Sequence, residues 1–173
     1  RQVFEQIRAR FMQIARELKV ECGLKEELEE IYNRISLGEK KDYAASRGEY
    51  LNGRILAAYL GWDFVDAADV IRFTDTGIFD AEATNELMQR ELAKHEYAVI
   101  PGFYGARPDG TIKTFSRGGS DITGSIVARA VGAELYENWT DVSGFLVVDP
   151  RIVENPRTIH TITYRELREI SYM

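Results

Sequence analysis

The chain has 173 residues, 45% hydrophobic and 29% charged, which suits one soluble globular domain with a sizeable core. Its formal net charge of −6 at pH 7 argues against general nucleic-acid binding, because no basic stripe is available to neutralise phosphates. The single cysteine excludes an internal disulfide and a cysteine-based zinc site, and two histidines are too few for a histidine-rich metal centre. The sequence contains no run of about 18 apolar residues, so it predicts no membrane span.

Three helices are predicted in the first 60 residues. Apolar residues recur at helical spacing in 1–18, 25–35 and 42–60, with Gly23 after the first helix and Gly61 at the end of the third. The third helix is unusual because it contains two glycines and the sequence Ser46-Arg47-Gly48-Glu49. A glycine inside a helix costs about 1 kcal/mol relative to alanine, so it usually indicates close packing or the approach of a ligand.

Short apolar strands then alternate with helices. The sequence predicts a short strand with its loops in 62–73, a helix over 81–94, and a buried strand over 97–100 that stops at Pro101-Gly102. A loop or hairpin follows over 103–113 with Asp109-Gly110 as its turn, and later come a strand over 133–139, an apolar run over 145–148 and a helix over 164–171. This alternation predicts an α/β fold, a three-layer αβα sandwich with a largely parallel sheet.

The most informative stretch is the glycine turn Gly118-Gly119, which leads directly into an amphipathic helix that ends at Gly132. Ser120 is a suitable N-cap, because its hydroxyl can accept a hydrogen bond from a free N–H of the first turn. The glycines allow backbone N–H groups to approach a ligand, and the helix N-terminus favours an anion, most often a phosphate. Arg117, beside the turn, can pair with a carboxylate. On these residues alone, an ordinary glycine turn before a capped helix explains the pattern equally well.

Two further clusters are expected near this turn. In parallel sheets, ligands bind at the C-terminal ends of the strands, where Pro101-Gly102-Phe103 would lie. The other cluster is Thr140-Asp141-Val142-Ser143-Gly144, followed by Asp149-Pro150-Arg151. Taken singly, each is more simply a turn or a rigid loop. Their combination and order carry the functional information.

Four motifs together resemble, in order and spacing, those of aspartate kinases, which are members of the amino-acid kinase superfamily. They are Pro101-Gly102-Phe103, Arg117-Gly118-Gly119-Ser120-Asp121, Thr140-Asp141-Val142-Ser143-Gly144 and Asp149-Pro150-Arg151. Ser46-Arg47-Gly48-Glu49 resembles the Ser-x-Gly-Glu motif of the same family. The resemblance runs from about Lys41 to the C-terminus. It implies the αβα sandwich of the superfamily, in agreement with the pattern of elements.

The resemblance implies that ATP phosphorylates the side-chain carboxylate of L-aspartate to give 4-phospho-L-aspartate, the first step of lysine, threonine and methionine biosynthesis. It also implies that Mg²⁺ is held mainly by the nucleotide, with no metal site in the chain. It implies that Glu49 binds the α-ammonium group of aspartate and that Arg117 pairs with a carboxylate, with Phe103 in the same pocket. The catalytic residues that it implies are Gly118, Gly119, Ser120 and Asp121. The nucleotide-binding residues that it implies are Thr140, Asp141, Gly144, Leu146 and Arg151.

The chain also departs from the family. Aspartate kinases begin with a strand carrying Lys-Phe-Gly-Gly and end in ACT domains, and neither is present in these 173 residues. Leu146 stands where many relatives carry a tyrosine. We therefore expect a single, incomplete amino-acid kinase domain over 1–173, inactive alone, with a helical N-terminal part over 1–40 and a motif-bearing part over 41–173. We also expect a cytoplasmic location, a possible homodimer, and no nucleic-acid or membrane partner.

Two alternatives stay open. The motifs Thr-Asp-x-x-Gly and Asp-Pro-Arg also resemble those of other amino-acid kinases, including glutamate 5-kinases. The departures from the family pattern would equally fit a non-catalytic module that binds a nucleotide or an amino acid. The motif Arg-Gly-Gly-Ser-Asp, which looks like aspartate kinases in particular, favours the first interpretation.

Overall fold

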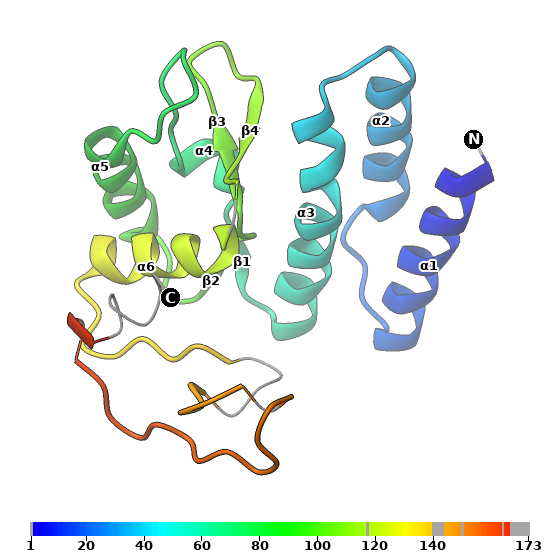
Figure 1. Ribbon diagram of the computed structural model, residues 1–173. Helices are drawn as coiled ribbons and strands as arrows, with labels where there is room; N and C mark the ends of the chain where they lie inside the picture. The colour runs from blue at the N-terminus through cyan, green and yellow to red at the C-terminus, as the bar shows by residue number, and fades with distance from the viewer. Residues whose placement is uncertain (1, 117, 140–143, 150, 164, 167–173) are drawn as a thin grey trace. The chain divides into compact units, whose positions relative to one another are not determined.

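The computed structural model describes residues 2–116, 118–139, 144–149, 151–163 and 165–166 (Figure 1). The chain divides into two compact units, residues 1–136 and 137–173, and each is described by itself. Within the described residues, no helix has the length and apolar character needed to cross a membrane.

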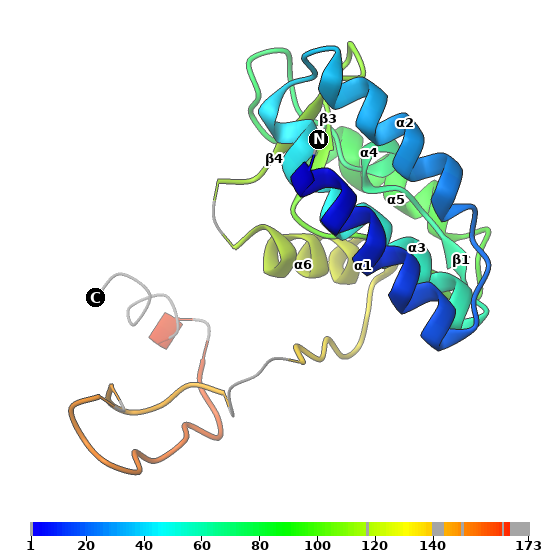
Figure 2. The same ribbon diagram turned by 90° about the vertical axis from the view of Figure 1, so that its right-hand side faces the viewer.

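The first unit begins with three helices, α1 (Gln2–Leu18), α2 (Leu24–Ser36) and α3 (Lys41–Leu60), which lie side by side in Figures 1 and 2. Gly61 ends α3 as predicted, with a φ of 68°. The first helix ends at Leu18, and Gly23, the predicted break after it, lies directly before α2 as its N-cap, also with a φ of 68°. That left-handed conformation is open to glycine at little cost and stops a helix. Leu28 of α2 and Leu51 of α3 are almost completely buried where the helices meet the core.

The strands follow α3. Strand β1 (Asp63–Phe64) pairs in parallel with β2 (Ala98–Val99), and the connection between them contains α4 (Ala67–Val70) and α5 (Ala81–Leu92). Asp66 and Asp80 begin these two helices, and each carboxylate accepts a backbone N–H of the first turn. The second pair is an antiparallel hairpin of β3 (Tyr104–Ala106) and β4 (Ile112–Thr114). Its turn at Asp109-Gly110, where Gly110 has a φ of 80°, confirms the predicted hairpin.

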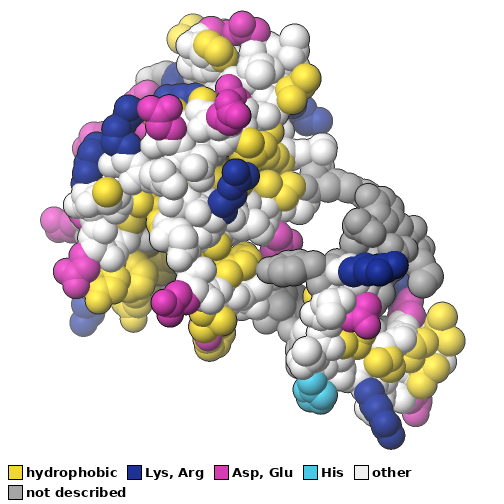
Figure 3. All heavy atoms as spheres, turned by 90° about the vertical axis from the view of Figure 1, so that its left-hand side faces the viewer, with side chains coloured by type: hydrophobic (Ala, Val, Ile, Leu, Met, Phe, Trp, Pro, Cys, Tyr) yellow, Lys and Arg dark blue, Asp and Glu magenta, His cyan; other side chains and the backbone are white. Residues whose placement is uncertain are grey.

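Helices cover both sides of these strands. In Figure 1, α3 lies on one side, and α5 with α6 (Gly119–Val131) lies on the other. The helix–sheet–helix arrangement and the parallel β1–β2 pair confirm the predicted α/β fold. The core between the layers includes the nearly inaccessible side chains of Leu28, Leu51, Val70, Ile71, Met88 and Tyr104. On the face over α5, acidic, basic and apolar side chains are interspersed (Figure 3).

One predicted strand is wrong. Residues 133–139 contain no strand, and the side chains of Leu135 and Trp139 are 73% and 89% exposed. A strand is stable only when a neighbour satisfies its backbone groups, and the residue types of a short segment cannot reveal whether such a neighbour is present. Most of the predicted helix over 164–171 lies outside the described residues.

The second unit contains a short antiparallel contact. Leu146 bridges to Thr158, and the N–H groups of Val147 and Ile159 donate to the carbonyls of Arg157 and Phe145. The predicted apolar run at 145–148 therefore forms one side of a short bridge.

Candidate functional site

The Ser46-Arg47 part of the α3 motif anchors the helix. The Ser46 hydroxyl donates to the carbonyl of Tyr43 at 2.8 Å and accepts from the Arg47 guanidinium at 2.9 Å. Arg47 is 8% exposed, and its guanidinium carbon lies 4.6, 4.5 and 5.3 Å from the ring centroids of Tyr43, Tyr50 and Tyr104. Cation–π contacts of this kind gain strength when the cation is removed from water. Arg47 therefore joins α3 to β3 through Tyr104.

The two glycines inside α3 have different surroundings. A Cβ at Gly53 would lie 3.1 Å from the Phe64 ring and 3.5 Å from the Pro101 side chain, so a packing reason is present there. A Cβ at Gly48 would meet nothing within 4 Å. Gly48 and the adjacent Glu49 are both exposed, so this turn of α3 faces open space.

The loop after β2 packs directly on the first turn of α6. Phe103 has a φ of 64°, a left-handed conformation that is costly for a residue with a bulky side chain. Its N–H donates to the Thr123 hydroxyl at 3.1 Å, and that hydroxyl donates to the Gly119 carbonyl at 2.8 Å. A Cβ at Gly119 would lie 2.5 Å from the Phe103 Cβ, and one at Gly102 would lie 3.0 Å from the Ser120 Cα. The two glycines therefore make this close approach possible.

Tyr104 holds the Phe103 turn from the other side. Its hydroxyl donates to Asp66 Oδ1 at 2.7 Å, and the same oxygen accepts the Ala68 N–H at 2.9 Å. Burial, with the nearby charge of Asp66, raises the pKa of the Tyr104 hydroxyl far above its ordinary value. The hydroxyl therefore stays protonated and acts as a fixed donor.

Helix α6 begins one residue after Gly118, which is its N-cap with a φ of 56°. The predicted N-cap at Ser120 is therefore wrong. Ser120 already lies inside the helix, and the N-cap residue Gly118 has no side chain with which to cap it. The left-handed Gly118 turns the chain so sharply that the helix starts before the serine. The Ser120 side chain is exposed, and Asp121 follows it in the first turn of α6.

An open pocket of about 450 Å³ lies between α3, β2 and α6, and it is the candidate functional site. Glu49 from α3, Gly102 from the loop after β2 and Ser120 from α6 all line it. The rest of the lining is largely apolar and comes from β2, α6 and the segment after α6: Ala98, Ile100, Thr123, Gly124, Val127, Ala128, Val131, Ala133, Leu135 and Tyr136. The carboxylate on one wall is suited to bind an ammonium group, and the α-helix N-terminus on the other wall is suited to bind an anion.

The pocket brings together only part of the predicted site. Glu49 and Ser120 both line it, whereas Phe103 is not in its lining and instead packs against Gly119. The sequence interpretation missed Thr123, whose hydroxyl joins the Phe103 turn to α6. Its place four residues after Gly119 was the available signal, since a helical threonine often donates to the carbonyl four residues back.

Gly118, Gly119 and Asp121 lie next to Ser120 at the start of α6 but are not among the residues that line the pocket. Six other predicted residues lie outside the described part of the first unit. Arg117, Thr140 and Asp141 lie outside the described residues. Gly144, Leu146 and Arg151 belong to the second unit. There the Arg151 guanidinium donates to Asp149 Oδ1 at 3.1 Å and to Oδ2 at 2.7 Å, and this hydrogen bonding lowers the pKa of the Asp149 carboxyl.

The part of the chain that the structure describes contains no group of three or more His, Cys, Asp or Glu residues placed to hold a metal ion.

Comparison with known families defines the class of protein. A model of the amino acid kinase family matches residues 6–173, and the chain belongs to this family. Within it, the chain is similar to aspartokinases. It is 36% identical over 186 residues to aspartokinase 3 of Bacillus subtilis (strain 168), an alignment that covers 97% of this chain and 40% of the relative.

Solved structures agree with this likeness. The crystal structure of Clostridium acetobutylicum aspartate kinase is 54% identical, with a TM-score of 0.91 over 99% of this chain and 40% of that one. E. coli aspartokinase III in complex with aspartate and ADP is 25% identical, with a TM-score of 0.76 over 90% and 40% of the two chains. The predicted resemblance to aspartate kinases is therefore confirmed, and the chain spans 40% of the length of these relatives.

Proposed function

We propose that the natural protein carrying this chain transfers the γ-phosphoryl group of ATP to the side-chain carboxylate of L-aspartate, forming 4-phospho-L-aspartate and ADP. The observation that carries the proposal is the pocket in which Glu49 of α3 and Ser120 of α6 face the same space. It occurs in a chain 54% identical to an aspartate kinase, and a more distant relative was solved with aspartate and ADP bound.

The residues are suited to binding an amino acid and a phosphate together. Glu49 would accept hydrogen bonds from the α-ammonium group of aspartate, and Arg117 would pair with one of its carboxylates. Gly118 and Gly119 would present backbone N–H groups to the transferred phosphoryl group, with Ser120 beside it. Asp121 would orient cationic side chains around that group.

The reaction needs little proton transfer, because the attacking carboxylate is already ionised. Catalysis then depends on holding two anions in line and on neutralising the charge that spreads over the phosphoryl oxygens. The positive end of the α6 dipole, at its N-terminus, would help to neutralise this charge. Thr140, Asp141, Gly144, Leu146 and Arg151 would contact the nucleotide, and Mg²⁺ bound with ATP would neutralise phosphate charge.

The test uses the full-length natural protein and a coupled assay for ADP release. We expect release to depend on L-aspartate. Glu49→Gln removes a charge-assisted hydrogen bond of about 1.5–3 kcal/mol, so the KM for aspartate should rise about 10- to 150-fold while the KM for ATP changes little. Glu82→Gln, on the exposed first turn of α5, is the matched control and should leave both values unchanged.

Other outcomes would separate the alternatives. Equal ADP release with L-glutamate would favour a glutamate kinase. Binding of nucleotide or amino acid without ADP release from any acid would favour a non-catalytic binding module. The homodimer and the cytoplasmic location remain predictions, which sedimentation and cell fractionation can test.

A further inference from the structure

Asp42 connects α3 with the β3–β4 hairpin. It lies in the first turn of α3, and its Oδ2 accepts the Thr114 N–H at 3.3 Å and the Lys113 ammonium at 3.4 Å. The Asp42 and Lys113 side chains are 29% and 32% exposed, so the ion pair is partly shielded from water. Burial by itself raises the pKa of the Asp42 carboxyl, but the bond from Thr114 and the charge of Lys113 outweigh it and the pKa lies below its usual value. Asp42 is therefore a carboxylate at neutral pH.

The geometry of the hairpin explains why Thr114 needs this partner. The N–H of Phe115 donates to the Phe103 carbonyl, and the N–H of Arg107 donates to the Thr111 carbonyl. Hydrogen-bonded and non-hydrogen-bonded pairs alternate in an antiparallel ladder, so the Thr114–Tyr104 pair is of the second kind and its Thr114 N–H points away from β3. Asp42 supplies the acceptor on this outer edge of β4.

Both partners of this contact lead to the candidate pocket. On α3, Glu49 follows Asp42 by seven residues, which is two helical turns or about 10 Å along the same face. On the other side, Thr114 ends β4, and the chain then runs through the glycine turn to Ser120 in α6. The contact of Asp42 with Lys113 and Thr114 therefore joins the helix that carries Glu49 to the strand that enters the glycine turn.

We infer that Asp42 is a positioning residue for the phosphoryl acceptor: through Lys113 and Thr114 it sets the spacing between Glu49 and the glycine turn. This inference rests on the proposed function, because it concerns how the acceptor amino acid is held. A merely structural contact would affect folding, or would affect both substrates alike. A positioning contact affects the acceptor and depends on Glu49.

A double-mutant cycle in the full-length natural protein tests this. Asp42→Ala should raise the KM for aspartate about tenfold, equivalent to about 1.4 kcal/mol, and change the KM for ATP by less than about twofold. Asp42→Asn keeps an acceptor for the Thr114 N–H but loses the charge facing Lys113, so its effect should be intermediate. In a Glu49→Gln background, Asp42→Ala should add less than about twofold, because no carboxylate is left to position.

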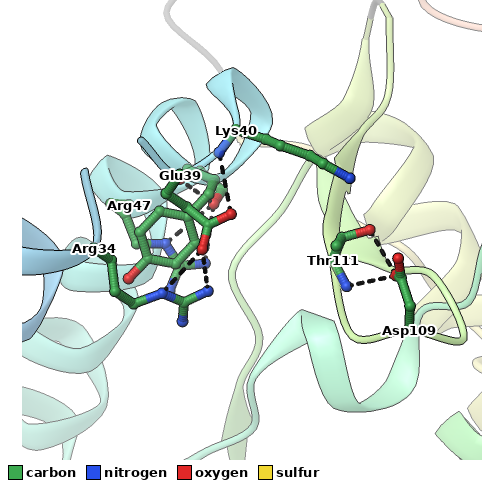
Figure 4. Close-up of polar contacts among 8 residues, drawn as sticks. Arg34, Glu39, Lys40, Arg47, Asp109 and Thr111 are labelled. Carbon is green, nitrogen blue, oxygen red and sulfur yellow. Dashed lines mark hydrogen bonds and ion pairs between the residues drawn. The ribbon is translucent and has the colours of Figure 1, made fainter. Parts of the chain in front are cut away.

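Asp109→Asn is the matched control. Asp109 is also a carboxylate that accepts a backbone N–H of the same hairpin, from Thr111 at 2.9 Å, but it lies at the turn (Figure 4). This variant should leave both KM values unchanged. Should Asp42→Ala fail to fold, Asp42→Asn and Lys113→Met test the same contact.

The results distinguish this inference from the proposed function. If Glu49→Gln raises the KM for aspartate and Asp42→Ala does not, the positioning role is overturned and the proposed function stands. An equal effect of Asp42→Ala with and without Glu49 also overturns it, because the contact is then only structural. If Glu49→Gln leaves the KM for aspartate unchanged, the acceptor role of Glu49 fails, and the positioning role fails with it.

Discussion

Replacing Gly119 with alanine is the sharpest test of the close approach between the Phe103 turn and α6. The added Cβ would lie 2.5 Å from the Cβ and 2.8 Å from the Cα of Phe103, and 3.1 Å from the Cβ of Phe115. Carbon atoms that are not bonded to each other lie about 3.5–4.0 Å apart at their optimal separation, so the turn and the helix must separate by about 1 Å. Rotation of a side chain cannot relieve the clash, because the Phe103 atoms belong to the backbone or are attached directly to it.

The expected cost follows from this displacement. Overpacking of this kind destabilises a protein by about 1–3 kcal/mol. The shift occurs where Ser120 lines the pocket, and a misplacement of about 1 Å can lower a catalytic rate about 100-fold. We therefore expect Gly119→Ala to lower both the free energy of unfolding and the kcat/KM for aspartate.

Two other glycines provide controls of different kinds. A Cβ at Gly118 would meet nothing within 4 Å, but its φ of 56° makes Gly118→Ala cost about 1–2 kcal/mol through backbone strain alone. A Cβ at Gly48 would also meet nothing within 4 Å, and its helical backbone should make Gly48→Ala stabilising by about 0.5–1 kcal/mol. Urea denaturation and ADP release, measured on the full-length natural protein, give the two readouts. If Gly119→Ala matches the wild type in both, or if Gly48→Ala is equally harmful, the reasoning from close approach is refuted.

Two further predictions concern the supports of the fold. The hydrogen bond between Asp63 and His95, at 2.7 Å, raises the pKa of His95 above the value of about 6.5 expected in the unfolded chain. The contribution of this bond to stability is therefore complete below about pH 6.5 and is lost as the pH rises through the folded-state pKa of His95. The stability difference between wild type and His95→Gln, measured by thermal unfolding at several pH values, should therefore shrink toward alkaline pH, and a difference that grows would contradict it. Tyr104→Phe should cost about 1–2 kcal/mol by removing the hydroxyl donor to Asp66, and a double-mutant cycle with Asp66→Ala should show a coupling of about 1 kcal/mol. Strict additivity would show that the hydrogen bond contributes nothing.

Local signals in the sequence predicted the elements that frame the site. The ends of α3 and α6 were found because Gly61 and Gly132 adopt the left-handed conformation that glycine permits. The hairpin over 103–113 was found because Asp109-Gly110 is suited to a tight turn. Each of these signals depends on a few consecutive residues, so they can be recognised without knowledge of the rest of the fold.

One local signal misplaced a helix start, and signals that depend on a distant partner failed or were missed. Serine is a residue type that favours the N-cap position, but the left-handed backbone of Gly118 starts the helix before Ser120. Residues 133–139 are predicted as a strand but form none. The contact of Asp42 with Lys113 and Thr114 has no local pattern, because the two sides are far apart in the chain.

The sequence by itself determined the types of element, several of their ends, and the family to which the motifs belong. Only the tertiary structure decided that Glu49 and Ser120 share one pocket, since this follows from the packing of α3 and α6 around β2. It also decided where glycine is favoured by packing, because another segment leaves little room for a Cβ at Gly53 and Gly102 and none at Gly119. Such contacts depend on the surfaces that meet across the core, and no short stretch of sequence contains both surfaces.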